Sequence, residues 1–307
     1  GRGRTPQSLC NITRPEKSLL LRAPLSAGAG GLGLCDGGVF ESTGDPDYRA
    51  ILAAITKAAG RHREAKRFDM PGFRPNDHYI IQMQRFGILP EDLPRPDGWE
   101  LAVDFMPAFE VGGDFYDVFV LGSDTVAFSI GDVSGKSISA AILMSHTTTL
   151  LRAFAQRLHT ESDSPLEVVD LLNRHICSYQ LRKEAEVRFV SLFLGVLNTR
   201  SGVLAYVNAG HVPPYVASTD GQVCGLAPTG LALGLSADAT YDSATRRLFP
   251  GDLLFAYTDG VTEAMNTEGT LFSKDRLMPI LSGNRAHAGT CVEAVAAAVR
   301  KHAGGRE

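Results

Sequence analysis

Three aspartates lie beside glycine, next to strongly apolar stretches of the chain. Asp114 follows two glycines in VGGDFYD, Asp132 lies in GDVSGK, and Asp259 lies in YTDG. Glycine beside a carboxylate lets the backbone approach a ligand closely and leaves its carbonyl groups accessible. Carboxylate, carbonyl and water oxygens are the ligands that hard cations such as Mg²⁺ and Mn²⁺ prefer. We therefore predict that the three aspartates converge on an oxygen-ligand metal site.

Two metal ions bridged by a carboxylate would supply a specific chemistry. They polarise a phosphoryl group and lower the pKa of a bound water, which gives hydroxide for in-line attack on phosphorus. No side-chain nucleophile is then needed, and the sequence contains no G-x-S-x-G motif and no cysteine in a phosphate-binding loop. A phosphohydrolase that forms an aspartyl phosphate would need an Asp-x-Asp pair after a strand. Asp132 is followed by Val133 and Ser134, which argues against that class.

Strands and helices that could position these aspartates are predicted in separate blocks. Alternating apolar residues and turn signals predict strands, and an apolar stripe at helical spacing predicts a helix. Strands are expected at 101–105, 115–121, 125–132, 189–197, 203–208, 215–217 and 253–257, and helices at 138–158, from 164 onward and at 290–302. Segregated blocks favour an α+β fold, with antiparallel sheets flanked by helices, over an alternating parallel α/β fold.

Bulk composition excludes several classes of protein. A formal net charge of -4 over 307 residues gives no electrostatic reason to expect nucleic acid or an anionic membrane as partner. The five cysteines form no C-x-x-C pair, which fits neither a disulfide framework nor a zinc knuckle and favours a reducing compartment. No apolar run reaches the roughly 18 residues needed to cross a bilayer. We expect a cytoplasmic protein.

The first 88 residues are predicted to be an extension or linker with short helices. Residues 1–45 are rich in Gly, Pro, Ser and Arg and are expected to be loop. A helix is expected at 45–59, with Asp45 as its N-cap and Pro46 at its first position, and a second helix at 77–86. Residues 14–60 and 68–90 resemble the end of cytochrome-c-associated modules of planctomycete-like multidomain proteins. The C-x-x-C-H motif is absent, so no haem is predicted.

Residues 89–307 carry a second and more specific resemblance. The strings PAFEVGGDFYDVF, FSIGDVSGKSISAAILM, YVNAGHVPPYV, GLALGL and PGDLLFAYTDGVTEAMN are similar, in order and spacing, to motifs of the bacterial PPM (PP2C-like) serine/threonine phosphatases of the SpoIIE and RsbU type. The resemblance implies a PPM sandwich of antiparallel sheets and a metal-dependent protein phosphatase. It also implies two Mn²⁺ or Mg²⁺ ions, bridged by Asp132, with the Val133 carbonyl on one ion, Asp259 on the second, and Asp114 bound directly or through water beside Gly113.

Three further residues of these motifs have two interpretations each. Asp117 is either a metal ligand or a residue that hydrogen-bonds its turn, and the second is favoured. His211 is either a general acid for the leaving serine alkoxide or a residue that structures its loop, and the loop role is favoured. Lys136 is either a point charge that attracts phosphate or a solvated side chain after a glycine turn, and the solvated role is favoured.

The end of the sequence departs from the family pattern. Members of the family close with an Asp-Asp pair and a final apolar strand, whereas this sequence stops after the helix expected at 290–302. We therefore expect the PPM domain to lack its final strand. The leading hypothesis is hydrolysis of phosphoserine or phosphothreonine in a regulatory protein, which by resemblance is an anti-sigma-factor antagonist of the STAS type. The alternative is a pseudophosphatase that binds a partner without turnover. A homodimer is left open.

Overall fold

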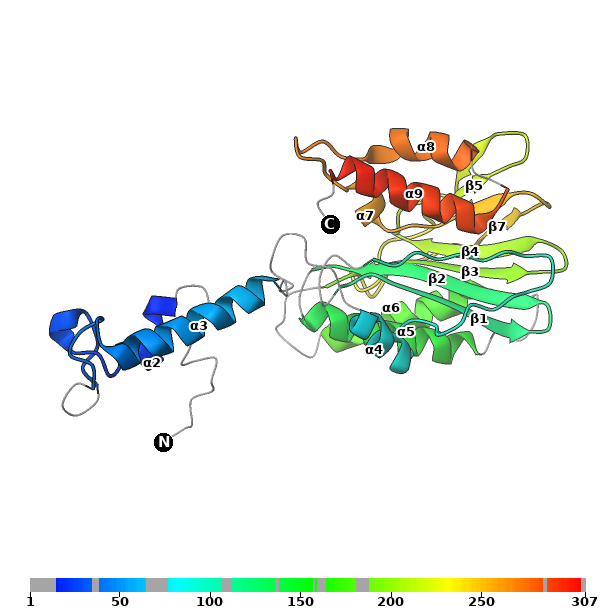
Figure 1. The fold of residues 1–307 in the computed structure, drawn as a ribbon. Helices are drawn as coiled ribbons and strands as arrows, with labels where there is room; N and C mark the ends of the chain where they lie inside the picture. Colours follow the sequence, from blue (N-terminus) through cyan, green and yellow to red (C-terminus); the bar gives the residue numbers. More distant parts are fainter. Residues whose placement is uncertain are drawn as a thin grey trace. The chain divides into compact units, whose positions relative to one another are not determined.

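The computed structural model describes residues 15–34, 39–64, 77–106, 112–135, 138–156, 158, 164–180, 188–283 and 286–304. The chain divides into two compact units, Gly1–Phe73 and Arg74–Glu307. Each unit has its own apolar core, and each is described by itself below. In Figure 1 the first unit is drawn in blue and the second in cyan to red.

The described part of the first unit contains short helices within residues 1–45, a stretch predicted to be loop. It contains the short helices η1 (Pro15–Lys17), α2 (Leu19–Arg22) and η2 (Ala27–Ala29) and the long helix α3 (Pro46–Glu64). Five buried side chains form its core: Leu21, Leu25, Phe40, Tyr48 and Ile55. Leu21, Leu25 and Phe40 are apolar residues in a glycine-rich stretch, where they show no helical or strand periodicity. Only their packing with α3 reveals that they belong to a core.

The start of α3 confirms the predicted cap. Asp45 Oδ1 accepts hydrogen bonds from the backbone N–H of Asp47 at 2.8 Å and of Tyr48 at 3.2 Å. These bonds satisfy N–H groups that the first helical turn cannot pair internally. The helix continues to Glu64, beyond the predicted end at residue 59.

Two antiparallel sheets form the centre of the second unit. The larger has strand order β1-β2-β3-β4-β7, and the smaller has order β6-β5-β8. Their bounds are β1 Phe115–Gly122, β2 Thr125–Val133, β3 Val190–Asn198, β4 Val203–Ala209, β5 Tyr215–Ala217, β6 Val223–Gly225, β7 Ala244–Arg247 and β8 Leu253–Phe255. Each neighbouring pair in both sheets is antiparallel, as the sequence predicted.

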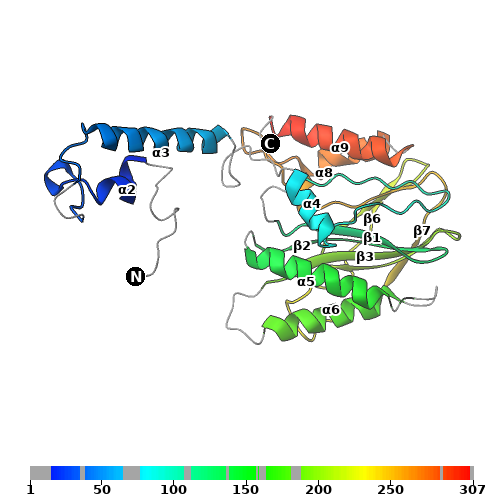
Figure 2. The same ribbon diagram turned by 60° about the horizontal axis from the view of Figure 1, so that its bottom comes forward.

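Helices cover the outer faces of both sheets. They are α4 (Asp77–Arg85), α5 (Ile138–Ala155), α6 (Pro165–Gln180), the short α7 (Asp259–Thr262), α8 (Ser273–Gly283) and α9 (Ala288–His302). Figures 1 and 2 show α5 and α6 on one side of the larger sheet, with α8 and α9 on the far side of the unit. None of the helices in the described residues is both long and apolar enough to cross a membrane.

Three apolar clusters hold these layers together. The first lies between α5, α6 and the larger sheet and includes Met144, Leu172 and Leu192. The second packs the smaller sheet against α8 and α9. The third lies between the two sheets and includes Phe193 and Val216. Burial on both faces explains why β3 reads as a nearly continuous apolar run, since strands covered on both sides need few polar residues.

One predicted strand is wrong, and several elements were not predicted. Residues 101–106 form no strand, and both Leu101 and Val103 are more than a third exposed. Their alternating pattern resembles a strand, but a strand also requires a hydrogen-bonded neighbour. Conversely, β7 has the polar sequence ATRR, and β6 has only three residues, so neither carried an apolar signal. The helix α8 was also missed.

Candidate metal centre

Strands β1 and β2 bring Asp114 and Asp132 to opposite positions. Phe115 pairs with Gly131 in the ladder, and the Val133 N–H donates to the Gly113 carbonyl at 3.2 Å. The same register therefore places Asp114 directly across from Asp132. Side chains opposite each other in an antiparallel pair project from the same face of the sheet. The predicted proximity of these two aspartates thus follows from strand register.

The face from which Asp132 projects is the one that meets the smaller sheet. Phe128 and Ile130 alternate with Asp132 along β2, and both pack against the cluster between the sheets. Val133, one residue on, lies in the cluster on the opposite face, under α5 and α6. The two carboxylates therefore lie at the end of the large sheet, on its inner face.

A missing side chain at Gly113 makes room for oxygen atoms. A Cβ built on Gly113 would collide with the Val133 carbonyl oxygen and would lie 2.6 Å from Asp132 Oδ1. Asp114 is the next residue in the chain, and its Oδ1 atom is buried from solvent. The Asp132 carboxylate and the Val133 carbonyl approach this glycine, and Asp114 adds a carboxylate next to it in the chain. Such oxygen donors are of the type that Mg²⁺ and Mn²⁺ use. The residues at this place fit such an ion.

A buried histidine connects this end of the large sheet to the small sheet. Ser191 pairs with Asp132 in the β2–β3 ladder, and its hydroxyl lies 2.9 Å from His211 Nδ1. On the other side of the ring, Nε2 lies 3.1 Å from the carbonyl oxygen of Tyr257, two residues before Asp259. The histidine is therefore a physical link between the two aspartate-bearing segments.

The contacts of His211 define its tautomer. A carbonyl oxygen can only accept, so Nε2 carries the hydrogen and Nδ1 accepts the hydrogen of the Ser191 hydroxyl. The side chain is 3% exposed, and burial lowers the pKa of His211 to about 4. The neutral ring uses its one N–H in the bond to the Tyr257 carbonyl, so it holds no spare proton for a leaving group at neutral pH. The loop-structuring role favoured from the sequence agrees with this geometry.

The turn that carries His211 is itself held by a buried amide. Asn208 Oδ1 accepts the backbone N–H of His211 at 2.8 Å, and its Nδ2 donates to the Leu226 carbonyl at 3.3 Å. Asn208 lies in the sequence NAGH, so its motif was visible, but its role was not. Ser191 was missed altogether, because only the register of β2 and β3 pairs it with Asp132.

Asp259 is placed differently from the other two aspartates. It is the first residue of the four-residue helix α7, and it is exposed. Within the described residues, no group of three or more His, Cys, Asp or Glu side chains is arranged to hold a metal. The structure thus brings together Asp114, Asp132 and the Val133 carbonyl, and it does not gather Asp259 with them. Convergence of all three aspartates stays a prediction.

Asp117 is occupied by an ion pair on the other face of the sheet. Its two carboxylate oxygens accept bonds from Arg152 of α5, at 2.5 Å to Nε and 2.7 Å to Nη2. Asp117 is 1% exposed, and the Arg152 guanidinium also lies 5.6 Å from the centre of the Phe119 ring. Asp117 therefore joins β1 to α5, which agrees with the structural role favoured from the sequence. Lys136 lies outside the described residues.

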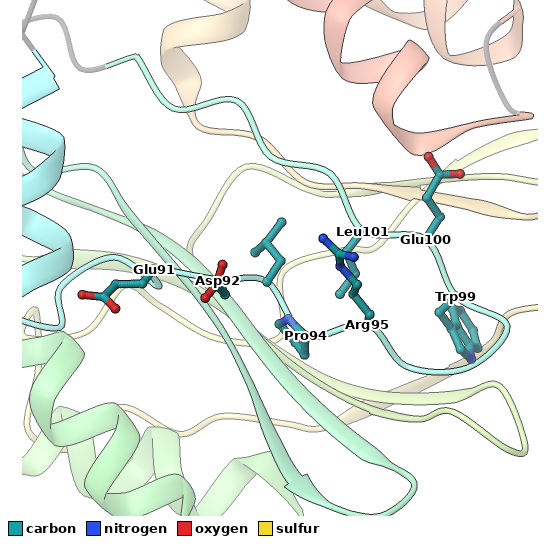
Figure 3. Close-up of a pocket in the computed structure, with 8 residues that line it drawn as sticks. Glu91, Asp92, Pro94, Arg95, Trp99, Glu100 and Leu101 are labelled. Atoms are coloured by element: carbon teal, nitrogen blue, oxygen red, sulfur yellow. The ribbon is translucent and has the colours of Figure 1, made fainter.

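The hollow in Figure 3 does not contain the predicted ligands. Its lining residues come from one extended segment: Glu91, Asp92, Leu93, Pro94, Arg95, Trp99, Glu100 and Leu101. The Trp99 indole N–H donates to the Thr199 carbonyl at 2.9 Å, and Glu100 accepts the Gly289 N–H at 3.2 Å. This segment therefore ties the turn after β3 to the start of α9.

Comparison with known proteins identifies the second unit. Residues 122–307 match the family described as Stage II sporulation protein E (SpoIIE). Protein IcfG of Synechocystis sp. is 34% identical over 215 residues, which cover 64% of this chain and 34% of that protein. Phosphoserine phosphatase RsbU of Bacillus subtilis is 29% identical over 189 residues, which cover 61% of this chain and 54% of RsbU. The chain thus spans about a third to a half of these relatives.

Solved structures show the same fold. The SiaA-PP2C domain of Pseudomonas aeruginosa has a TM-score of 0.56 and 22% identity, and covers 64% of this chain and 77% of that one. The PP2C phosphatase domain of SpoIIE from Bacillus subtilis has a TM-score of 0.53 and 19% identity. The match covers 62% of this chain and 54% of that one. These likenesses confirm the predicted α+β fold of antiparallel sheets flanked by helices. They give no support to the resemblance of the first residues to a cytochrome-c-associated module.

Proposed function

The chain belongs to the SpoIIE family of PP2C-type serine phosphatases, and on that premise we propose that residues 89–307 hydrolyse phosphoserine or phosphothreonine in a regulatory protein. The observation that carries the proposal is the oxygen cradle at Gly113. There, Asp132 Oδ1 and the Val133 carbonyl approach a position that any side chain would fill. Such a cradle suits a divalent cation, and it lies inside the motifs that define the resemblance.

The proposed function assigns two metal ions to the cradle and the aspartates near it. Asp114, Asp132 and the Val133 carbonyl would hold the first of two Mn²⁺ or Mg²⁺ ions, and Asp132 and Asp259 would hold the second. When bound, the ions supply a water of lowered pKa and polarise the phosphoryl group. The carboxylates contribute the negative charge that retains the cations, and His211 keeps the segment before Asp259 beside Ser191.

The substrate is proposed from the relatives. RsbU and RsbP of Bacillus subtilis carry the name phosphoserine phosphatase. The family resemblance extends this to a phosphorylated anti-sigma-factor antagonist of the STAS type. A folded protein substrate is consistent with the exposed position of Asp259, since a surface site admits a phosphoserine on another protein.

Phosphate release tests this function. The full chain should release phosphate from a phosphoserine peptide in the presence of Mn²⁺ or Mg²⁺. The release should stop when EDTA is added. A phosphorylated STAS protein should be a better substrate than the free peptide. Turnover that persists in EDTA would refute the metal mechanism, and equal rates on the two substrates would refute the assignment of the partner.

A second candidate is a module that binds a phosphorylated partner without hydrolysing it. The observation in its favour is that Asp259 joins no group of metal-ligating side chains in the part of the chain that the structure describes. This candidate predicts that the phosphoprotein binds and that no phosphate is released at any concentration of Mn²⁺. The same assay, run beside a binding measurement, separates the two functions.

A further inference from the structure

The carbonyl of Val133 has a direction set by the residue that follows it. The Ser134 N–H donates to the Phe189 carbonyl at 2.9 Å, on the β3 side. In a trans peptide, the N–H and the preceding C=O point in opposite directions. The Val133 oxygen is therefore turned away from β3 and toward β1, where Gly113 leaves room for it. The orientation of this predicted ligand thus depends on how Ser134 is held.

Two further hydrogen bonds hold Ser134. Its hydroxyl accepts the Phe189 N–H at 2.9 Å, and its carbonyl accepts a hydrogen bond from Arg188 Nη1 at 2.9 Å. All three polar groups of Ser134 are thus engaged by two consecutive residues directly before β3. Loss of any of these bonds would free a peptide plane next to the cradle.

Gly135 makes the arginine contact feasible. Its φ is +96°, a conformation that a residue with a side chain rarely adopts. A Cβ at this position would also collide with Arg188 Nη1. The half-buried guanidinium therefore lies against bare backbone in the loop that follows Asp132 and Val133.

Arg188 contacts the backbone that follows the predicted ligands. The β2–β3 ladder ends at the pair of Val133 and Val190, and Arg188 lies two residues before Val190. Its guanidinium donates to the Ser134 carbonyl, in the residue directly after Val133. Arg188 is thus placed to act through the backbone of Ser134.

We infer that Ser134 and Arg188 are positioning residues that clamp the Val133 carbonyl in the orientation required for metal binding. We name Ser134, Gly135, Arg188 and Phe189 the Ser134 clamp. The inference rests on the proposed function, because that function assigns a metal to the carbonyl. Groups that orient metal ligands from outside the coordination sphere typically change metal affinity by about 10- to 100-fold when they are removed.

Mn²⁺ affinity of the full chain, measured by calorimetry, tests the clamp. Arg188→Met should weaken binding by about 10-fold, because it removes the donor to Ser134. Arg188→Lys retains a donor and should lose less. Gly135→Ala should displace the guanidinium and weaken binding as Arg188→Met does. The matched control is Arg200→Met, since Arg200 is an exposed arginine paired with Asp124 at 2.9 Å, in a different turn.

A kinetic readout distinguishes positioning from a general loss of structure. If the clamp acts on the metal, excess Mn²⁺ should restore phosphate release by Arg188→Met, with KM for an aryl phosphate unchanged. Equal Mn²⁺ affinity in Arg188→Met and the parent, or a raised KM at unchanged affinity, would overturn the inference. A parent that binds Mn²⁺ but releases no phosphate would refute the proposed function alone, and the clamp would still be judged by affinity. If Arg188→Met does not fold, Ser134→Ala takes its place.

Discussion

The end of β2 and the end of β8 carry the predicted aspartates on very different supports. Strand β2 has nine residues and pairs with β1 and β3 along both edges. Strand β8 has three residues and pairs with β5 alone among the described strands. Asp132 is part of its ladder, whereas Asp259 lies beyond its strand and is exposed. Strand pairing therefore positions the first aspartate, whereas the segment before the second is held by the His211 contact and by the packing of Tyr257.

Asp132→Asn should have the largest effect. The amide keeps the shape of the side chain but removes the negative charge that the bridging role requires. We expect phosphate release to fall by more than about 100-fold, since metal ions contribute several kcal/mol of charge stabilisation. Cys224→Ser is the control, because Cys224 is exposed and distant in sequence from every predicted ligand. Equal losses in the two variants would contradict the assignment of Asp132.

Gly113→Ala should have the next largest effect, through space rather than charge. The added methyl group would occupy the position beside Asp132 Oδ1 and the Val133 oxygen. We expect Mn²⁺ affinity, measured by calorimetry, to fall by about 10-fold or more, in the range found when the surroundings of a metal site are disturbed. Gly122→Ala, at the other end of β1, meets no atom within 4 Å and should bind Mn²⁺ as the parent does. A Gly113→Ala chain with parental affinity would argue against the cradle.

His211→Gln should have a smaller effect, concentrated at the Asp259 end. Glutamine retains one donor or acceptor but cannot span from the Ser191 hydroxyl to the Tyr257 carbonyl as the ring does. We expect turnover to fall by about 10-fold. Higher Mn²⁺ should recover part of that loss. If His211 were the general acid instead, the loss would persist at saturating Mn²⁺.

The same histidine predicts how stability depends on pH. Burial lowers the pKa of His211 from the ordinary 6.5 to about 4, so the unfolded chain takes up a proton before the folded chain does. The free energy of unfolding contributed by this group is complete above pH 6.5 and is lost as the pH falls toward about 4. Urea unfolding in EDTA at about pH 7.5 and about pH 5 should show this loss in the parent. A His211→Gln chain with the same pH dependence as the parent would show that another group is responsible.

Asp117→Asn should leave Mn²⁺ affinity unchanged. Its carboxylate is paired with Arg152 on the face away from Asp132, so its loss should affect only stability. We expect the free energy of unfolding to fall by about 2 kcal/mol, the usual scale for a hydrogen-bonded charged group. Calorimetry and urea unfolding on the same sample check both parts. A clear loss of Mn²⁺ affinity would indicate that Asp117 is a metal ligand.

Local signals in the sequence account for what could be predicted. The apolar runs of β2 and β3 and the apolar stripes of α5 and α6 follow from burial against neighbouring layers. The glycine next to Asp114 lies where a side chain would collide with the Val133 carbonyl, a close backbone approach of the kind that the glycine signal indicates. These features depend on residues close together in the chain, and residue type and spacing therefore suffice to detect them.

Features that depend on distant partners could not be predicted. The Ser191–His211 contact requires the register of three strands, and the Asp117–Arg152 pair joins residues 35 positions apart. Residues 101–105 had a strand pattern without a neighbouring strand to bond. The position of Asp259 relative to the other aspartates depends on the direction of α7, and no local sequence pattern predicts that direction.

The attachment of Trp99 to the turn after β3 gives the protein an optical reporter. Trp99 is the single tryptophan of the chain, its ring is half-buried against the cluster between the sheets, and its indole N–H is bonded to Thr199. Indole emission shifts to longer wavelength when the ring enters water. Excitation at the red edge of the indole band therefore observes this one peptide segment. Release of residues 91–101 from the sandwich would shift the indole emission to longer wavelength.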